Sequence, residues 1–290
     1  MKFKTIFFLF NAVVAFSFLF IFLFPLFILG GEYAAGFWKA NWFLGVFFLV
    51  ILGVLNGFFL SNWKLFQLVE REDWSALTTW LEDRMFKKGS LRGQYVRLYV
   101  NSAMLRSDLA AIDRLEALLR ERKPALLRRL AVLFGVGYLL RNEAESSLAF
   151  FEPFLESPEV EARGWLWLDY AFCLILRNRA PESLPWLRRA SARKDPVLTL
   201  LAAYLTANIA APALASEPDR TAARSAAEEI RDGLRKRFDP ERWSREVEKA
   251  KNDVHVVILS RLLDDSGRWL FDRPAARDPD SPAPARDARA

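Results

Sequence analysis

The sequence predicts an all-α protein attached to a membrane, and three observations support this fold class. Two long runs without charge occupy the N-terminal quarter of the chain. From about Ser61 onward, amphipathic stretches suited to helices alternate with short polar turns, and no alternating strand pattern accompanies them. Because 52% of the residues are hydrophobic and yet 26% are charged, the composition indicates two regimes in one chain.

The two uncharged runs predict a transmembrane hairpin over residues 1–63. The first span is expected at about 5–31 and the second at about 40–63. A bilayer core about 30 Å thick requires roughly 20 residues of helix, so each run is long enough to cross. A cleaved signal peptide is the alternative for the first run, but the apolar region of such a peptide is normally only about 7–15 residues long.

Charges that flank the two runs predict the orientation of the hairpin. Lys2 and Lys4 precede the first span, Lys64 and Arg71 follow the second, and the remaining chain is rich in arginine. By the positive-inside rule both termini face the cytoplasm, and a loop of about eight residues lies outside. We therefore expect an integral protein of a bacterial-type inner membrane. The single cysteine excludes an intramolecular disulfide, which agrees with a reducing compartment.

A helix–turn–helix pattern recurs four times after the hairpin. Each turn is marked by an arginine that follows an apolar helix and precedes a second, shorter one. These arginines are 35, 35 and 36 residues apart: Arg71, Arg106, Arg141 and Arg177. A repeated helix pair of this length indicates a stacked repeat architecture, and the tetratricopeptide class has a period of about 34 residues.

The third and fourth repeats resemble the tetratricopeptide repeat (TPR) family in their residues as well as in their period. The positions that carry the resemblance are Ala131, Phe134, Gly135, Tyr138 and Asn142 in the third repeat, and Trp167, Tyr170, Ala171, Leu174 and Asn178 in the fourth. Small residues at Gly135 and Ala171 are expected to let paired helices approach closely. The resemblance implies a TPR-like α-solenoid over 64–238, most strongly over 124–196.

The helix WLWLDYAFCLIL at 165–176 is the most apolar stretch of the repeats, and it carries one charge, Asp169. The segment between Arg163 and Arg177 makes roughly 20 Å of helix, too short to cross a bilayer. We therefore expect this helix inside the solenoid. The uncharged segment 196–216 is long enough to cross, but a crossing would place the arginine-rich residues after it outside, against the positive-inside rule. A repeat helix is expected there, with a third span as the alternative.

The C-terminal part is expected to close the solenoid. Asp239-Pro240-Glu241 predicts a helix start, because an acid suits the N-cap and proline suits the first helical position. This helix is expected to run to about Asp264 and, within a capping element over 239–271, to cover the apolar face of the last repeat. The Pro-, Asp- and Arg-rich residues 272–290 predict a disordered tail.

No arrangement of residues predicts catalysis, a metal site or a cofactor. His255 and Cys173 are the single histidine and cysteine, and both are expected to be packed helix residues. Gly135-x-Gly137 has neither the third glycine nor the preceding strand of a phosphate loop. The net charge of +6 is too dispersed to favour nucleic acid. We expect neither an enzyme nor a small-molecule substrate, and a membrane enzyme is the weakest alternative.

A surface for protein partners remains as the predicted functional feature. The resemblance implies that the first helices of the repeats line a concave groove. The residues expected in it are Arg97, Asn101, Arg129, Val132, Val136, Leu139, Trp165, Leu168, Phe172 and Ile175. An apolar groove suits an amphipathic or extended hydrophobic segment. The alternative is that these side chains fill the core or receive the helix at 240–264.

Two functions follow from this reading. The first is a membrane-anchored adaptor or scaffold that mediates protein–protein interactions at the cytoplasmic face of the membrane. The alternative is an accessory subunit of a transport or export complex that acts through the hairpin, where small residues such as Gly45, Gly53 and Gly57 can pack against a partner's helices.

Overall fold

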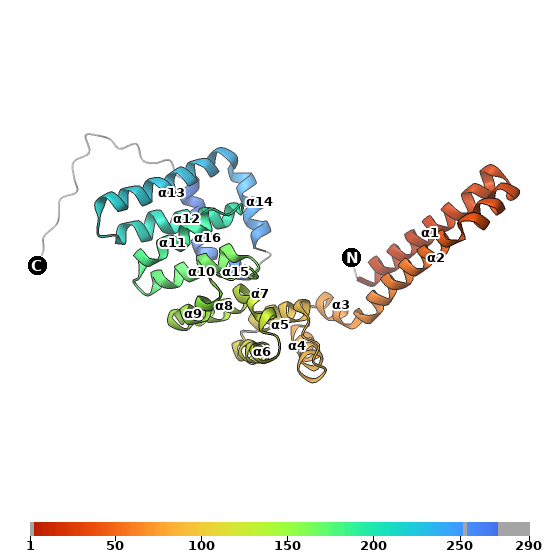
Figure 1. Cartoon of the computed structure of the whole chain (residues 1–290), viewed down its shortest axis with the longest axis horizontal. Helices are drawn as coiled ribbons and strands as arrows, with labels where there is room; N and C mark the ends of the chain where they lie inside the picture. The colour runs from red at the N-terminus through yellow and green to blue at the C-terminus, as the bar shows by residue number, and fades with distance from the viewer. Residues whose placement is uncertain (1–2, 252–253, 272–290) are drawn as a thin grey trace, which may run out of the picture. The chain divides into compact units, whose positions relative to one another are not determined.

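The computed structural model describes residues 3–251 and 254–271, and within these ranges it is all-helical, without strands (Figure 1). This confirms the prediction of an all-α protein. The chain divides into two compact units, Met1–Ser107 and Asp108–Ala290, which are treated separately below. The predicted disordered tail over 272–290 lies outside the described residues.

Unit 1 begins with two long apolar helices that contact each other, α1 (Phe3–Leu29) and α2 (Gly31–Ser61). Between them the chain turns at Gly30, whose φ of 84° is a conformation that glycine adopts readily. The expected loop of about eight residues is therefore wrong, because a single glycine makes the turn and the following residues are already helical. The rings of Phe18 and Phe48 stack across the helix pair at 4.3 Å.

Most described apolar side chains of α1 and α2 are exposed. Over Ala35–Ser61, α2 is long and apolar enough to cross a membrane, and α1 contains a shorter apolar stretch over Thr5–Ile21. The polar side chain of Asn56 is satisfied within its own helix, because its amide donates to the carbonyl oxygen of Leu52 at 3.0 Å. Asn11 does the same in α1. These properties suit an apolar solvent, in which polar groups must find partners internally.

The remainder of unit 1 consists of short helices around a small core. They are α3 (Trp63–Glu70), α4 (Trp74–Glu82), the π-helical turn η1 (Asp83–Lys87) and α5 (Gly93–Leu105). Leu77, Leu81 and Tyr99 are fully buried among them. The Tyr99 hydroxyl donates to Glu82 at 2.8 Å and ties α5 to α4.

Unit 2 contains the other helices. They are α6 (Leu109–Arg122), α7 (Pro124–Arg129), α8 (Ala131–Leu140), α9 (Ala144–Phe151), α10 (Arg163–Leu176), α11 (Ala180–Ser191), α12 (Pro196–Leu205), α13 (Glu217–Arg237), α14 (Pro240–Ala250), α15 (Val254–Ile258) and α16 (Ser260–Phe271). From α6 to α13 each helix packs against the next, whereas α14 packs against α12. Three short non-α turns complete the unit: η2 (Glu152–Phe154), η3 (Thr206–Ala210) and η4 (Ala211–Ala213).

Two apolar segments that raised the membrane question lie in the core of unit 2. Nine of the fourteen residues of α10 are buried, which confirms the prediction that this helix lies in the interior of the protein. Seven of the ten residues of α12 are also buried, against α11, α13 and α16. The stretch Pro196–Ala213 is long and apolar enough to span a membrane, but 56% of it is buried within the protein. Most of its apolar residues therefore pack against other parts of the protein.

The four turns marked by arginine share one backbone conformation. The residue after each arginine has a positive φ of 53–58°: Glu72, Ser107, Asn142 and Asn178. In three of them two backbone hydrogen bonds close the helix end. In the third repeat, for example, the N–H groups of Asn142 and Glu143 donate to the carbonyl oxygens of Leu139 and Tyr138. This is the Schellman arrangement, in which a left-handed residue ends a helix and satisfies its last carbonyl groups.

Replacement of a left-handed turn residue tests this conformation. Asn142→Ala is expected to lower the free energy of unfolding by about 1 kcal/mol, because the left-handed region costs an ordinary L-residue about 1–2 kcal/mol and asparagine less. Asn142→Gly, which has no such cost, is the matched control and should be at least as stable as the original. Urea unfolding of the full chain in mild detergent measures both. Equal stability of the two variants would contradict the assignment.

The predicted capping helix is divided into three. Asp239 caps α14 by accepting a hydrogen bond from the Arg242 N–H at 2.8 Å, as predicted, but α14 ends at Ala250 rather than near Asp264. α15 packs against α8, whereas α16 packs against α12 and α13. The expectation of one continuous helix is wrong. α15 and α16 pack against different helices, and one straight helix cannot contact both sets of neighbours.

Candidate partner-binding surface

The structure divides the ten residues predicted to line a groove. Arg97 and Asn101 lie on α5 in unit 1, and the other eight lie on α7, α8 and α10 in unit 2. The buried members are Val132, Val136, Trp165 and Leu168; the half-buried ones are Asn101, Leu139, Phe172 and Ile175; the exposed ones are Arg97 and Arg129. A partner reaches the four buried side chains only if the segments that cover them move.

The chain's own C-terminal segment lies on part of this face. α15 packs against α8, the helix that carries Val132 and Val136. Val256 in α15 is 1% exposed, and Leu259, the residue that follows α15, is 4% exposed. Both side chains are therefore buried. This matches the alternative in which the face receives the C-terminal segment. The side chain of His255, in the same helix, lies outside the described ones.

The large apolar residues that remain exposed in the repeats lie at the turn ends of the first helices. Leu105, Leu140 and Leu176 are 64%, 44% and 45% exposed, and each is the last residue of its helix. Leu140 and Leu176 belong to unit 2. Packing within the chain does not require a large apolar side chain at these places, so an exposed leucine that recurs at the end of successive first helices is a candidate contact point for a partner. We call Leu140 and Leu176 the turn-edge leucines.

Sequence reasoning missed these leucines because a helical apolar pattern assigns every periodic apolar residue to the core. The available signal was the dipeptide Leu-Arg, which recurs at 105–106, 140–141 and 176–177. The last residue of a helix that ends in a left-handed turn lies at its rim, where a neighbouring helix covers it poorly.

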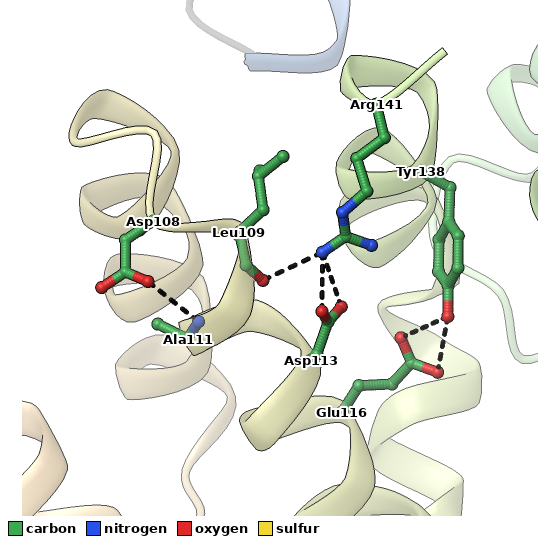
Figure 2. Close-up of polar contacts among 7 residues, drawn as sticks. All are labelled: Asp108, Leu109, Ala111, Asp113, Glu116, Tyr138 and Arg141. Atoms are coloured by element: carbon green, nitrogen blue, oxygen red, sulfur yellow. Dashed lines mark hydrogen bonds and ion pairs between the residues drawn. The ribbon is translucent and has the colours of Figure 1, made fainter. Parts of the chain in front are cut away.

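The arginines beside the turn-edge leucines are held in place by acids of the preceding helix pair. Arg141 Nη2 donates to both carboxylate oxygens of Asp113, at 2.7 and 2.8 Å, and to the carbonyl oxygen of Leu109 at 3.1 Å (Figure 2). In the next repeat Arg177 Nε lies 3.0 Å from Glu145 of α9. Such partly exposed pairs add little stability each. Both pairs join a turn to the helix pair that precedes it.

A buried acid connects α6 to α8 beside this turn. Glu116 is 5% exposed and accepts a hydrogen bond from the Tyr138 hydroxyl at 3.1 Å (Figure 2). It also accepts one from Arg120 Nε at 2.9 Å. Burial, together with the negative charge of Glu116, raises the pKa of Tyr138 to about 12. The hydroxyl is therefore a neutral donor at physiological pH, and the contact is structural.

Asp169, on the buried face of α10, has an unusual environment. It is 0% exposed, and neither carboxylate oxygen has a hydrogen-bond partner among the described residues. Desolvation raises the pKa of Asp169 well above its usual value, so the folded protein holds it as a neutral acid. Cys173 follows one turn later, and burial raises the pKa of its thiol to about 12. It is a packed thiol rather than an activated one.

A basic aromatic cluster surrounds Trp167 on the same helix. The guanidinium groups of Arg163, Arg189 and Arg193 lie 4.9, 5.8 and 4.7 Å from the centre of its ring. Glu156 pairs with Arg163 at 3.3 Å and with Arg189, and the hydrogen bond from Arg189 lowers the pKa of Glu156. Over 3–251 and 254–271, no three His, Cys, Asp or Glu side chains gather to hold a metal.

Comparison with known proteins corrects the predicted resemblance. Residues 111–272, more than half of the chain, match the model of a family described as "Uncharacterised Treponema protein". The chain is also 27% identical over 243 residues to an "Uncharacterized protein" of Treponema pallidum (strain Nichols), covering 81% of this chain and 77% of that relative. No solved structure matches. The resemblance to the tetratricopeptide repeat family is therefore wrong; its period and turn residues reflect helix-pair stacking, which other families share.

Proposed function

We propose that this chain, which belongs to the family described as "Uncharacterised Treponema protein", is an adaptor. In this proposal it is anchored in a bacterial inner membrane and binds protein partners at the cytoplasmic face. The proposal is drawn from the surface of the chain itself. The observation that carries the proposal is the pair of turn-edge leucines, exposed at equivalent places in successive repeats. Apolar side chains presented at a regular spacing on a rigid stack suit a protein partner with matching apolar side chains.

The anchor in this proposal is a transmembrane hairpin made of α1 and α2. Its support is the exposed apolar surface of both helices and their internally bonded asparagines. Lys64 and the arginine-rich chain after it favour a cytoplasmic location for the rest of the protein.

The scaffold in this proposal is a solenoid of helix pairs. Its support is the shared left-handed turn at intervals of 35–36 residues and the pairing of Arg141 and Arg177 with the preceding helix pair. The buried faces of α8 and α10 hold Leu140 and Leu176, which end these helices, in ordered positions, and this order lowers the entropic cost of binding.

The test captures partners with the full-length chain. Tagged protein is expressed in the bacterium, crosslinked in its membrane, solubilised and purified. Leu140→Glu/Leu176→Glu replaces the turn-edge leucines, and Ala117→Glu/Ala149→Glu adds the same charge at exposed positions of α6 and α9. Circular dichroism and the unfolding midpoint establish that both variants fold. We expect the Ala117→Glu/Ala149→Glu control to retain the partners and the Leu140→Glu/Leu176→Glu variant, called the leucine variant, to lose them.

Equal recovery with the leucine variant, or no specific recovery with the original chain, would overturn this assignment.

A second function, as an accessory subunit acting through the membrane helices, is favoured by one observation. Gly53 and Gly57, one turn apart on α2, are exposed, and a Cβ added at either would meet no atom within 4 Å. Small residues of this kind let membrane helices approach closely. Loss of partners in Gly53→Leu/Gly57→Leu, with retention in the leucine variant, would select this function.

A further inference from the structure

A cavity of ≈ 620 Å³ lies at the N-terminal part of α10, beside the turn that joins α11 to α12. Its walls differ in chemistry. One side is apolar and includes Pro158, Val160 and Leu198. The other carries three cationic side chains, Arg163, Arg193 and Lys194. The cavity is in unit 2 and contains neither turn-edge leucine, so it is a second site, independent of the proposed adaptor surface.

The acid that lines this cavity is already engaged by the protein. Asp195 Oδ1 accepts hydrogen bonds from the N–H groups of Val197 and Leu198, at 3.0 and 3.2 Å. Its Oδ2 accepts from Trp165 Nε1 at 3.1 Å. These bonds cap α12 and orient the carboxylate toward α10 and the start of α12. The carboxylate is therefore committed to structural hydrogen bonds.

The cations are only partly compensated. Arg163 pairs with Glu156, which also pairs with Arg189 outside the cavity. Arg193 and Lys194 have no acidic partner among the described residues. A concave site with an excess of one sign of charge concentrates counter-ions. The cavity therefore attracts anions.

Arg193 is held in place before any ligand arrives. Its guanidinium group lies 4.7 Å from the ring centre of Trp167. Its aliphatic stem lies against the backbone of Gly164, where an added Cβ would come within 3.0 Å of Arg193 Cγ. A side chain ordered by such contacts loses less entropy on binding than a free surface arginine.

We propose that this cavity binds a phosphate ester. The planar guanidinium of Arg193 presents paired donors to phosphate oxygens, and the adjacent Lys194 ammonium supplies a compact second charge. The apolar wall of Pro158, Val160 and Leu198 receives the organic part of the ester, which inorganic phosphate lacks. The ester is either the headgroup of an anionic phospholipid or a soluble organic phosphate, and both have this chemistry.

Calorimetric titration of the full chain in non-ionic detergent tests the proposal. Glycerol 3-phosphate and inorganic phosphate are added at an ionic strength held constant with potassium chloride. We expect glycerol 3-phosphate to bind more tightly than inorganic phosphate. Arg193→Gln/Lys194→Gln should weaken binding at least tenfold. Arg224→Gln/Lys236→Gln removes the same charge from exposed positions of α13 and should leave it unchanged.

Lys194→Gln alone serves as the second variant, because it leaves the stacking of Arg193 on Trp167 intact and so preserves the fold. It should weaken binding by a smaller factor. No binding above the chloride background would overturn the proposal. Equal weakening by the α13 control would overturn it too, since binding would then reflect overall charge.

Reconstitution in nanodiscs distinguishes the two sources of the ester. The full chain is placed in nanodiscs of phosphatidylcholine alone or of phosphatidylcholine with phosphatidylglycerol. If glycerol 3-phosphate binds at least tenfold more weakly with phosphatidylglycerol present, the anionic headgroup occupies the cavity. If binding is the same in both, the ligand is soluble. Either result supports a phosphate-ester site.

Discussion

Gly135→Ala is expected to lower the free energy of unfolding by about 1–3 kcal/mol, because it inserts a methyl group where two helices already touch. A Cβ at Gly135 would lie 2.1 Å from Cε1 and 2.2 Å from Cζ of Phe151. The Phe151 ring is fully buried, so it cannot turn away without displacing its neighbours in a close-packed interior. The gain in helix propensity of about 1 kcal/mol from glycine to alanine is smaller than this clash. Urea unfolding of the full chain in mild detergent, followed by tryptophan fluorescence, measures the difference.

Gly137, two residues later in α8, provides the matched control. A Cβ there would lie 3.7 Å from Ile112, which is an ordinary contact. Gly137→Ala should therefore raise the free energy of unfolding by up to about 1 kcal/mol through reduced entropy of the unfolded chain. Phe151→Leu, combined with Gly135→Ala, should recover part of the loss because it removes the clashing ring atoms. The close approach of α8 and α9 would be disproved if both alanine variants changed stability in the same direction.

Asp169→Asn is expected to remove a large pH dependence of stability. The pKa of Asp169 is raised in the folded protein, so the folded state binds a proton that the unfolded state releases above about pH 4. Its contribution therefore falls as pH rises, by up to about 1.4 kcal/mol per pH unit, until the folded pKa is reached. Asparagine has nearly the same shape and does not ionise. The variant should match the original near pH 4 and be increasingly more stable between pH 5 and pH 7.

Unfolding curves at pH 5, 6 and 7 measure this difference directly. Acids such as Glu156 make the opposite contribution: Arg189 lowers the pKa of Glu156, so this side chain stabilises the fold as pH rises. That contribution is the same in the variant and in the original, so the difference between their curves does not contain it. Asp264→Asn is the control, since this side chain is exposed, and its curves should run parallel to those of the original. If the Asp169→Asn curves also run parallel, the buried carboxyl is not held as a neutral acid.

The helix pairs could be predicted from the sequence because their signals are local. Apolar periodicity placed α10 in the interior, and the arginine spacing located four turns that share one backbone conformation. The close approach at Gly135 was likewise expected from its small size. Each of these features depends on residues within a few turns of helix, and such residues are neighbours in the sequence.

The features that could not be predicted depend on contacts between distant segments. α15 covers α8 from more than 110 residues later in the chain, and no local pattern indicates this contact. The exposure of Leu140 and Leu176 likewise depends on how distant segments pack, because these two side chains are left exposed where the rest of the chain does not cover them. The cavity near Trp165 combines a loop, two helices and a turn, whose meeting is a property of the fold. The family also differed from expectation, because stacking of helix pairs imposes a similar period on unrelated sequences.

The direction of the ion pairs at the turns has a consequence for how the chain assembles. Arg141 reaches back to Asp113, and Arg177 reaches back to Glu145, so each arginine finds its acid in a segment that the ribosome has already released. Successive helix pairs can dock one after another as they emerge, without waiting for later residues. α15 is the exception, because α8 is made long before it. The part of α8 that α15 covers therefore stays uncovered until residues 254–258 have been made.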